Sequence, residues 1–329
     1  MEYSVLDTQT VTALVNDATT APSLHNAQPW KFVFRRESGV LELHADPSRS
    51  LPHTDPAGRA LHISCGAALF TLRVAAAHRG WEPEVSVLPE AARPGLLAAV
   101  RLAKPPRTVE ELAALHAAVR RRHTSRFPFA DTPVPQEVRE ALAAAALAEG
   151  ALLVFPGAWH VKALLDLVED AERHDSEDPE RVAELGRWTR LGAAAADTAA
   201  DGVPEYAFGP RRRTGGAAVR DFAARRPVAD RGAVDFEFLP QLALLGTAED
   251  DPAAWLRSGQ ALQRVLLLAT CHDLAVGLSS QVLERGELRW AARDPLTAMS
   301  YVQMVLRIGY GPTGPSSPRR RVRDVVTFA

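Results

Sequence analysis

The sequence predicts an α+β chain made of two similar halves, and three observations support this. Each half begins with a helical pattern and a strand, and continues with a long apolar helix and a late apolar strand. The segment Lys104-Pro105-Pro106 interrupts the periodicity between them. With 329 residues, of which 47% are hydrophobic, the chain can also bury a large core. We therefore expect one half over residues 1–104 and a second over 105–329.

Hydrophobic periodicity and capping signals place the elements of the first half. An apolar stripe from Leu61 to Ala76 marks a long helix, and Gly80 supplies its C-terminal cap. The other elements expected there are a helix over about 8–19 and strands over about 31–35, 40–45 and 96–102.

The second half opens with a helix whose start is marked by Thr108 and Glu111, which have the spacing of a capping box. Pro135 begins a further helix, and Gly150 ends it. A second long apolar helix is expected from residue 252 to residue 277. The remaining elements expected are strands over 151–155 and 303–308 and helices near 160–170, 179–196 and 285–292.

Residues 197–240 have a different composition, with scattered Gly, Pro and Arg and little periodicity. Such a segment is either disordered or a lid over a site. Aromatic residues that provide apolar anchors favour the lid, and they are Tyr206, Phe208, Phe222, Phe236 and Phe238.

Composition argues against several classes of function. A net charge of −2 gives no overall field toward nucleic acid or an anionic membrane. Cys65 and Cys271 fall in apolar helical patterns, which predicts buried free thiols, and no His or Cys spacing is that of a metal site. No apolar run approaches about 20 residues, and no basic-then-apolar signal segment opens the sequence. We therefore expect no membrane span and a cytoplasmic protein.

The loop over residues 21–30 is the most informative segment. It reads Ala-Pro-Ser-Leu-His-Asn-Ala-Gln-Pro-Trp, with Ser23, His25, Asn26 and Gln28 between two prolines. Short polar side chains on a stiff backbone suit a loop that presents hydrogen-bond donors to a flat polar ligand. On composition alone, an ordinary turn bounded by prolines is an equally good interpretation.

This loop resembles the signature loop of the nitroreductase superfamily of FMN enzymes. The stretch Arg122-His123-Thr124-Ser125-Arg126-Phe127 resembles the family's Arg-x-Ser/Thr-x-Lys/Arg phosphate motif. The tail with Gly309-Tyr310 and Arg319-Arg320 resembles the family's C-terminal end, so the resemblance covers nearly the whole chain. It implies a duplicated nitroreductase-like fold with mostly antiparallel sheets flanked by helices.

The order of these motifs departs from the usual family pattern. A typical member carries the phosphate motif before the loop, and two subunits pair to form two composite flavin sites. Here the loop lies in the first half and the phosphate motif in the second. Each half keeps a complementary part, which is similar to the single-chain pseudo-dimer of the Acg-like branch. The resemblance therefore implies a monomer with a pseudo-two-fold axis and one FMN site.

The resemblance also implies which residues would contact FMN. Arg122, Thr124 and Arg126, together with Arg319 and Arg320, would hold the phosphate, because fork-shaped guanidinium donors match its oxygens. The plain alternative for Arg120 to Arg122 is a solvated helix end, and for residues 279–284 a helix-to-loop joint. The flavin ring would contact Pro22, Ser23, Leu24, Asn26 and Gln28 from the first half and Ser280, Gln281, Val282 and Glu284 from the second.

The flavin would carry the redox chemistry, so a catalytic side chain is not required. His25 is a weak catalytic candidate, since a histidine in a tight loop is more often structural. No Gly-x-Gly-x-x-Gly follows a strand and opens a helix, which argues against a dinucleotide-binding Rossmann domain. NAD(P)H, if it is the reductant, would dock transiently over the flavin.

Several functions remain open. The first is an FMN-dependent oxidoreductase that takes hydride from NAD(P)H and reduces a nitroaromatic, quinone or enone. The second is an FMN-sequestering protein with little nitroreductase activity, and the third a flavin-dependent oxidase or dehydrogenase in a biosynthetic pathway. A scaffold without flavin is a further alternative. Arginines at 211–213 and 225–226 would attract NADPH phosphates and favour an enzyme, whereas a lid anchored over the ring by Phe222, Phe236 and Phe238 would favour sequestration.

Overall fold

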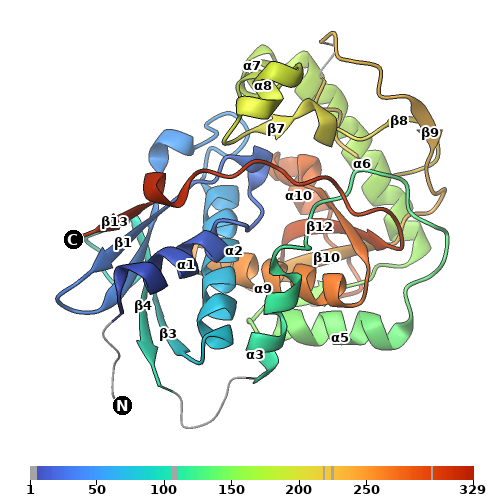
Figure 1. Ribbon diagram of the computed structural model, residues 1–329. Helices are drawn as coiled ribbons and strands as arrows, with labels where there is room; N and C mark the ends of the chain where they lie inside the picture. Colours follow the sequence, from blue (N-terminus) through green and yellow to red (C-terminus); the bar gives the residue numbers. More distant parts are fainter. Residues whose placement is uncertain (1–5, 105–109, 218, 224–225, 298) are drawn as a thin grey trace.

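Two sheets flank a pair of long helices, and a lid lies over one end of this arrangement (Figure 1). The computed structural model describes residues 6–104, 110–217, 219–223, 226–297 and 299–329. Thr108 and its capping box therefore lie outside the described residues.

The first half supplies most of a five-stranded sheet with the order β13-β1-β2-β4-β3. Its strands pair antiparallel, except that β13 pairs parallel to β1. The elements of this half are α1 (Thr8–Ala18), η1 (Leu24–Asn26), β1 (Trp30–Arg35), β2 (Val40–Ala45), η2 (Pro47–Arg49), α2 (Arg59–His78), β3 (Glu82–Val87) and β4 (Leu96–Ala103).

The second half builds a four-stranded antiparallel sheet with the order β11-β12-β10-β5. Its first elements are α3 (Glu110–Ala114), α4 (His116–Val119), α5 (Gln136–Leu147), β5 (Leu152–Val154), α6 (Ala158–Glu177) and α7 (Pro179–Arg187). After the lid come β10 (Leu242–Thr247), α9 (Pro252–Cys271), β11 (Ala275–Ser279), η4 (Gln281–Leu283), α10 (Gly286–Ala291), β12 (Tyr301–Gly309), η5 (Val322–Asp324) and β13 (Val326–Phe328).

The two halves have corresponding topologies. Along the chain, β1, β2, α2, β3 and β4 match β5, β10, α9, β11 and β12, and the sheet order β1-β2-β4-β3 matches β5-β10-β12-β11. The second half differs by the long insertion between β5 and β10. The C-terminal segment crosses back to the first half, where β13 extends the sheet beside β1 (Figure 1).

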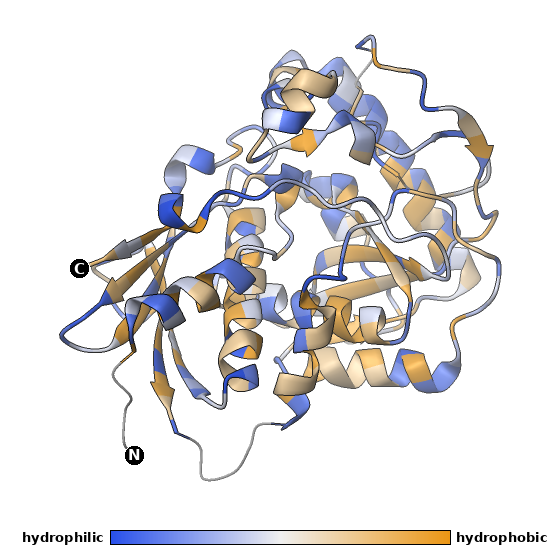
Figure 2. Cartoon of the chain, in the orientation of Figure 1, coloured by the Kyte–Doolittle hydropathy of each residue, from blue (hydrophilic) through white to orange (hydrophobic). Residues whose placement is uncertain are grey.

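Helices α2 and α9 pack against each other at two glycines. A Cβ on Gly259 would lie 2.1 Å from the Ile63 carbonyl oxygen, and one on Gly66 would lie 2.3 Å from the Leu256 carbonyl oxygen. Only residues without a side chain allow two helix backbones this close. Apolar residues follow α2 and the strands of both sheets (Figure 2), so this contact joins the two cores.

Helix α2 corrects one expectation from the sequence. Arg59–His78 is long and apolar enough to cross a membrane, with a mean hydropathy of 1.5 over its best 18 residues, so the expectation that no apolar run approaches this length was wrong. In the fold, 89% of that window is buried. A helix that is apolar on nearly all sides is also what the centre of a large core requires.

The insertion between β5 and β10, of which residues 197–240 are called the lid, is folded over its described residues. It contains β6 (Thr189–Arg190), α8 (Ala193–Thr198), β7 (Val203–Pro204), η3 (Glu205–Ala207), β8 (Arg211–Thr214) and β9 (Ala233–Asp235). Phe208 and Phe222 are buried in a small core of its own, and Phe236 is also buried. Tyr206 and Phe238 are exposed, so their prediction as anchors was wrong.

The second long helix ends six residues earlier than the periodicity predicted. It stops at Cys271, and Asp273 adopts a left-handed conformation with φ of 54°. Residues 275–279 then form β11 instead. Cys271 is exposed as a result, whereas Cys65 is buried as expected.

Other differences concern short elements. The predicted helix over 179–196 breaks after Arg187, because residues 189–190 pair with β7. Strands β3 and β10 were not predicted. The helix predicted near 160–170 continues to Glu177, and the helix predicted after Thr108 is divided at Leu115 into α3 and α4. The other predicted helices and strands are confirmed with small shifts at their ends.

We predict that Gly259→Ala destabilises the fold by about 3 kcal/mol, since overpacking of a core costs this order of free energy and the clash is with backbone. Urea unfolding followed by circular dichroism measures the change. Gly95→Ala is the control, because a Cβ there meets nothing within 4 Å. Equal unfolding midpoints for the two variants would contradict the prediction.

Candidate functional site

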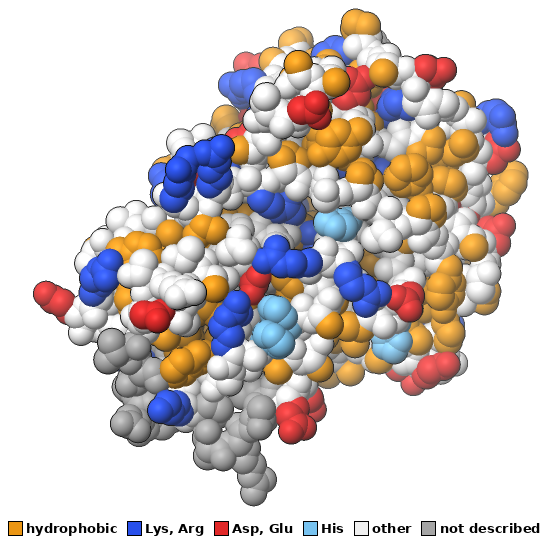
Figure 3. Space-filling view, in the orientation of Figure 1, with side chains coloured by type: hydrophobic (Ala, Val, Ile, Leu, Met, Phe, Trp, Pro, Cys, Tyr) orange, Lys and Arg blue, Asp and Glu red, His pale blue; other side chains and the backbone are white. Residues whose placement is uncertain are grey.

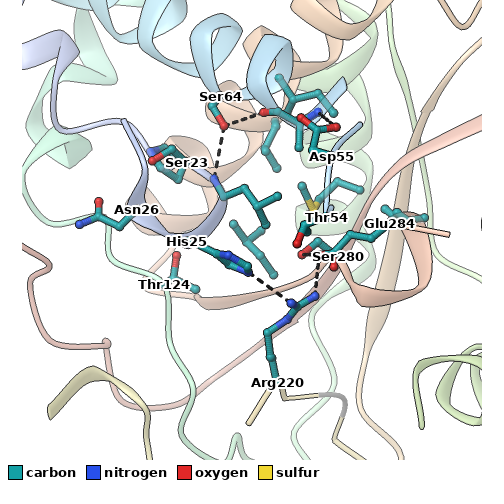
Figure 4. Close-up of a pocket in the computed structure, with 18 of the residues that line it drawn as sticks. Ser23, His25, Asn26, Thr54, Asp55, Ser64, Thr124, Arg220, Ser280 and Glu284 are labelled. Atoms are coloured by element: carbon teal, nitrogen blue, oxygen red, sulfur yellow. Dashed lines mark hydrogen bonds and ion pairs between the residues drawn. The ribbon is translucent and has the colours of Figure 1, made fainter. Parts of the chain in front are cut away.

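A cavity of about 340 Å³ lies where the two halves and the lid meet. Its size is within the usual range of small-molecule sites, roughly 300–1,000 Å³. Of the residues predicted from the sequence, those that line it are Pro22, Ser23, Leu24, His25, Asn26, Arg122, Thr124, Arg126, Ser280, Glu284 and Arg319 (Figure 4).

The polar loop forms one wall in an unusual backbone conformation. His25, Asn26 and Gln28 all have positive φ, between 50° and 55°. Each such residue costs on the order of 1–3 kcal/mol and persists only where surrounding contacts hold it. The Gln28 amide donates to Ser23 Oγ at 2.9 Å, and the Leu24 amide donates to Ser64 Oγ on α2 at 3.3 Å.

Asn26 and Gln28 also join the loop to two distant segments. Asn26 Nδ2 donates to the Gly202 carbonyl at 2.9 Å and to the Pro318 carbonyl at 3.0 Å. Gln28 Nε2 donates to the Ala200 carbonyl at 2.9 Å, and its Oε1 accepts from the Arg320 amide at 2.9 Å. These two side chains therefore fasten the start of the lid and the C-terminal segment to the loop.

Arg122 and Arg319 form a buried pair of like charges. Arg122 donates to the Thr20 carbonyl at 3.1 Å, and Arg319 donates to the same oxygen at 3.0 Å. Burial and the charge of Arg319 lower the pKa of Arg122 to about 9, and burial lowers the pKa of Arg319 to about 10. Among the residues that the structure describes, no carboxylate pairs with either group, and the Nε of each has no hydrogen-bond partner.

The other predicted phosphate residues do not all join this pair. Thr124 lines the cavity, and its backbone bridges to Val276 of β11. Arg126 instead contacts the lid: it donates to the Ala207 carbonyl at 2.8 Å, and its guanidinium lies 4.7 Å from the centre of the Phe222 ring. Burial and the charge of Arg220 lower the pKa of Arg126 to about 10.

Four of the predicted site residues do not line the cavity. Arg320 lies 3.8 Å from Asp46 and donates to the Trp30 carbonyl. Gln281 donates to Glu172 of α6, and Val282 packs in the core. These three residues and Gln28 therefore contact the segments that form the cavity without lining it.

Arg220 of the lid reaches between His25 and Glu284 (Figure 4). Its Nη1 atom lies 3.2 Å from His25 Nε2, and its Nη2 atom donates to Glu284 Oε1 at 2.5 Å. Ser280 Oγ donates to the same carboxylate oxygen at 2.8 Å. Burial alone would raise the pKa of Glu284, but the charge and hydrogen bond of Arg220 hold it below its ordinary value.

The same contact fixes the state of His25. A guanidinium can only donate, so Nε2 accepts and the neutral ring carries its proton on Nδ1. Burial, reinforced by the charge of Arg220, lowers the pKa of His25 to about 3. The ring is therefore neutral at physiological pH and is no general acid there.

Sequence reasoning missed the far end of the cavity. Asp55 accepts the amides of Ala60 and Leu61 and so caps α2, and Arg59 donates to the Gln303 carbonyl at 2.7 Å. Further lining residues that the sequence analysis missed include Thr54, Asp250, Trp255 and Arg289. An Asp ahead of a long apolar helix was the available signal. Arg220 carried no signal, because one arginine within an aperiodic segment rich in arginine is not distinctive.

Basic side chains gather near the middle of the face that Figure 3 shows. Arg79, Arg120 and His116 surround the buried carboxylate of Asp17 at 2.9–3.2 Å. In the described part of the chain, no group of three or more His, Cys, Asp or Glu side chains could hold a metal ion.

Burial of a neutral His25 predicts a pH dependence of stability. Its pKa rises from about 3 in the fold to about 6.5 in the unfolded chain, so the unfolded state binds the extra proton and stability falls as pH drops below 6.5. His25→Asn tolerates the left-handed backbone and removes this titration. When the pH is lowered from 6.5 to 5, we expect the free energy of unfolding of the variant to fall by roughly 1–2 kcal/mol less than that of the parent. Urea unfolding at each pH measures it. Parallel pH profiles would contradict the assignment.

The chain is similar in sequence to two proteins of Mycobacterium tuberculosis (strain ATCC 25618 / H37Rv). It is 34% identical over 330 residues to "Putative NAD(P)H nitroreductase Rv3131", covering 98% of this chain and 92% of the relative. It is 30% identical over 348 residues to "Putative NAD(P)H nitroreductase acg", covering 99% of this chain and 97% of the relative. No protein-family model matches the chain.

Solved structures show a weaker likeness. A crystal structure described as a putative nitroreductase from Anabaena variabilis aligns with 94% of this chain and 90% of its own, at a TM-score of 0.45 and 10% identity. The crystal structure of the "FMN and NADPH-dependent nitroreductase NfnB from sphigopyxis sp. strain HMH" aligns with 65% of this chain and 98% of its own, at a TM-score of 0.40 and 17% identity. The sequence relatives alone, matched over nearly their full length, establish that this chain belongs to the nitroreductase family, beside the Acg protein.

Proposed function

We propose that the protein is an FMN-dependent oxidoreductase that holds one FMN per chain between its halves. The observation that carries this proposal is the buried pair Arg122 and Arg319. Two guanidinium groups without a carboxylate cost several kcal/mol of desolvation that a bound dianion would offset. Phosphate matches their forked donors.

The remaining walls suit the rest of the cofactor. Pro22, Ser23, Leu24 and Asn26 offer a polar, rigid edge for a flat ring, and Ser280 and Glu284 lie across the cavity from them. FMN, when bound, supplies hydride transfer through its N5 atom, with NAD(P)H as the donor that the names of the relatives suggest. The protein's part is to bind, orient and shield the ring, with His25 as a neutral hydrogen-bonding group.

The proposal includes an internal duplication and a monomer. Identical strand order in both sheets supports the duplication, with the halves over residues 1–104 and 105–329. The loop from one half and Arg122 from the other meet in one chain, so no second copy is needed to complete the site. Absence of an equivalent loop after α5, where Gly150 leads directly into β5, supports a single site.

A second candidate function is shielded FMN binding with little turnover. Arg211, Arg212 and Arg213 do not line the cavity but pair with Asp230 of the lid, Glu169 of α6 and Asp235 of the lid. Arg226 donates to Thr189 Oγ1 and to backbone carbonyls, and Arg225 lies outside the described residues. The lid instead presents Phe222 to the cavity, which favours shielding over recruitment of NADPH.

An anaerobic visible spectrum separates these candidates. We expect the protein to bind added FMN and the band near 450 nm, a property of flavin itself, to bleach with NADPH or NADH. Bound flavin that stays oxidised with both donors supports the shielded binder. Protein that retains no FMN after gel filtration would contradict both.

Arg122→Ala is expected to weaken FMN binding by roughly 1.5–3 kcal/mol, the value of a hydrogen bond to a charged group. Fluorescence titration of FMN measures the dissociation constant. Arg121→Ala is the matched control, because the neighbouring Arg121 is exposed and pairs with Asp273 at 2.7 Å. If both variants bind FMN like the parent, Arg122 does not hold the phosphate.

A further inference from the structure

Arg220 occupies a position that neither the loop nor the phosphate pair explains. Its side chain is 9% exposed and lies at the boundary of three cavities: the site itself and two outer cavities of about 380 and 350 Å³. One outer cavity lies under the lid between α6 and α7, where Glu172, Asp175 and Arg181 line it. The other lies between α6 and the lid, beside Phe208 and Phe236.

The lid is fixed at both ends, and between them Arg220 and the Ala207 carbonyl, which accepts from Arg126, connect it to the cavity wall. At one end Gly202 is held by Asn26. At the other, Glu237 pairs with Arg307 at 2.9 Å, with both side chains at most 3% exposed. Between these points, Val219, Arg220 and Phe222 line the cavity.

The charge of Arg220 is compensated, unlike those of Arg122 and Arg319. Glu284 pairs with it directly, and Glu172 and Asp175 also surround it, so its pKa is raised although the side chain is buried. Glu284 is 2% exposed and is itself held by Ser280. Removal of either partner of an ion pair this buried strongly destabilises the structure around it, because the other charge is left buried and unpaired.

We propose that Arg220 is the gate of the site: its ion pair with Glu284 holds the lid closed and separates the cofactor cavity from the two outer cavities. A ligand that comes from the lid side reaches the cofactor only when this pair opens. The identity of the enclosed cofactor rests on the proposed function, but the gate itself rests on the contacts of Arg220.

Two measurements on the full chain test the gate. The first is amide hydrogen exchange, without FMN, of peptides covering the loop at residues 19–29 and the segment 278–285. The second is the dissociation rate of bound FMN, followed by fluorescence recovery after dilution. The variants are Arg220→Met, which removes the charge at similar length, Arg220→Lys, which keeps the charge, and Glu284→Gln, which removes the partner's charge.

We expect Arg220→Met and Glu284→Gln each to accelerate amide exchange of both peptides and release of FMN at least tenfold. For Arg220→Lys we expect both rates to lie between those of these variants and those of the parent. Arg213→Met is the matched control, since Arg213 lies on the same lid but is exposed and pairs with Asp235. It is expected to stay within twofold of the parent.

Exchange and release in Arg220→Met that match Arg213→Met would overturn the gate. If Arg220→Met fails to fold, Glu284→Gln decides by the same criterion. A parent protein that binds no FMN would refute the proposed function alone, because the exchange measurement on the flavin-free chain still tests the gate.

Discussion

The close approach of α2 and α9 is the constraint on which the site depends. Gly66 and Gly259 let the two backbones meet, and the two sheets are thereby held at a fixed separation. The same helices then contribute to the cavity: Arg59 and Ser64 come from the first turns of α2, and Trp255 from the first turn of α9. A wider helix pair would separate the loop of one half from the phosphate residues of the other.

The cavity contains buried arginines of two electrostatic kinds. Arg122 and Arg319 share the Thr20 carbonyl and have no carboxylate among the described residues, so burial lowers their pKa values. Arg220 has three carboxylates around it, and its pKa is raised. Uncompensated buried charge indicates a place for a ligand, whereas compensated charge indicates an internal contact. This difference is the reason why we propose binding for Arg122 and Arg319 and closure for Arg220.

Much of this arrangement could be predicted from the sequence, and the misses have physical causes. Periodicity located α2 because its apolar stripe is long, whereas β3 was missed because Pro83 and acidic residues interrupt its alternation. The end of α9 was missed because Leu274 continues the apolar pattern after the left-handed Asp273 has turned the chain. Periodicity records burial, and it does not record a change from helix to strand within a buried run.

The site was predicted at the level of segments better than at the level of side chains. The loop, the 122–126 stretch and the C-terminal arginines do converge, as the family pattern implied. Arg126 lines the cavity but contacts Phe222 of the lid, and Arg320 lies outside the cavity beside Asp46. Which of several neighbouring arginines faces a ligand depends on contacts made by residues far away in the sequence, here Ala207 for Arg126 and Gln28 for Arg320. A single chain without an alignment carries no signal for such contacts.

The two candidate functions differ mainly in the free energy needed to open the lid. Both ends of the lid are held by buried polar contacts, and opening at the cavity has to break the contacts between them, which include Arg220 with Glu284 and Arg126 with the Ala207 carbonyl. Each 1.4 kcal/mol of opening free energy lowers the open population tenfold, and the rate of any reaction that requires a second molecule at the flavin falls with that population. On the proposed gate, a few kcal/mol at this ion pair shifts the balance between a reductase and a shielded binder.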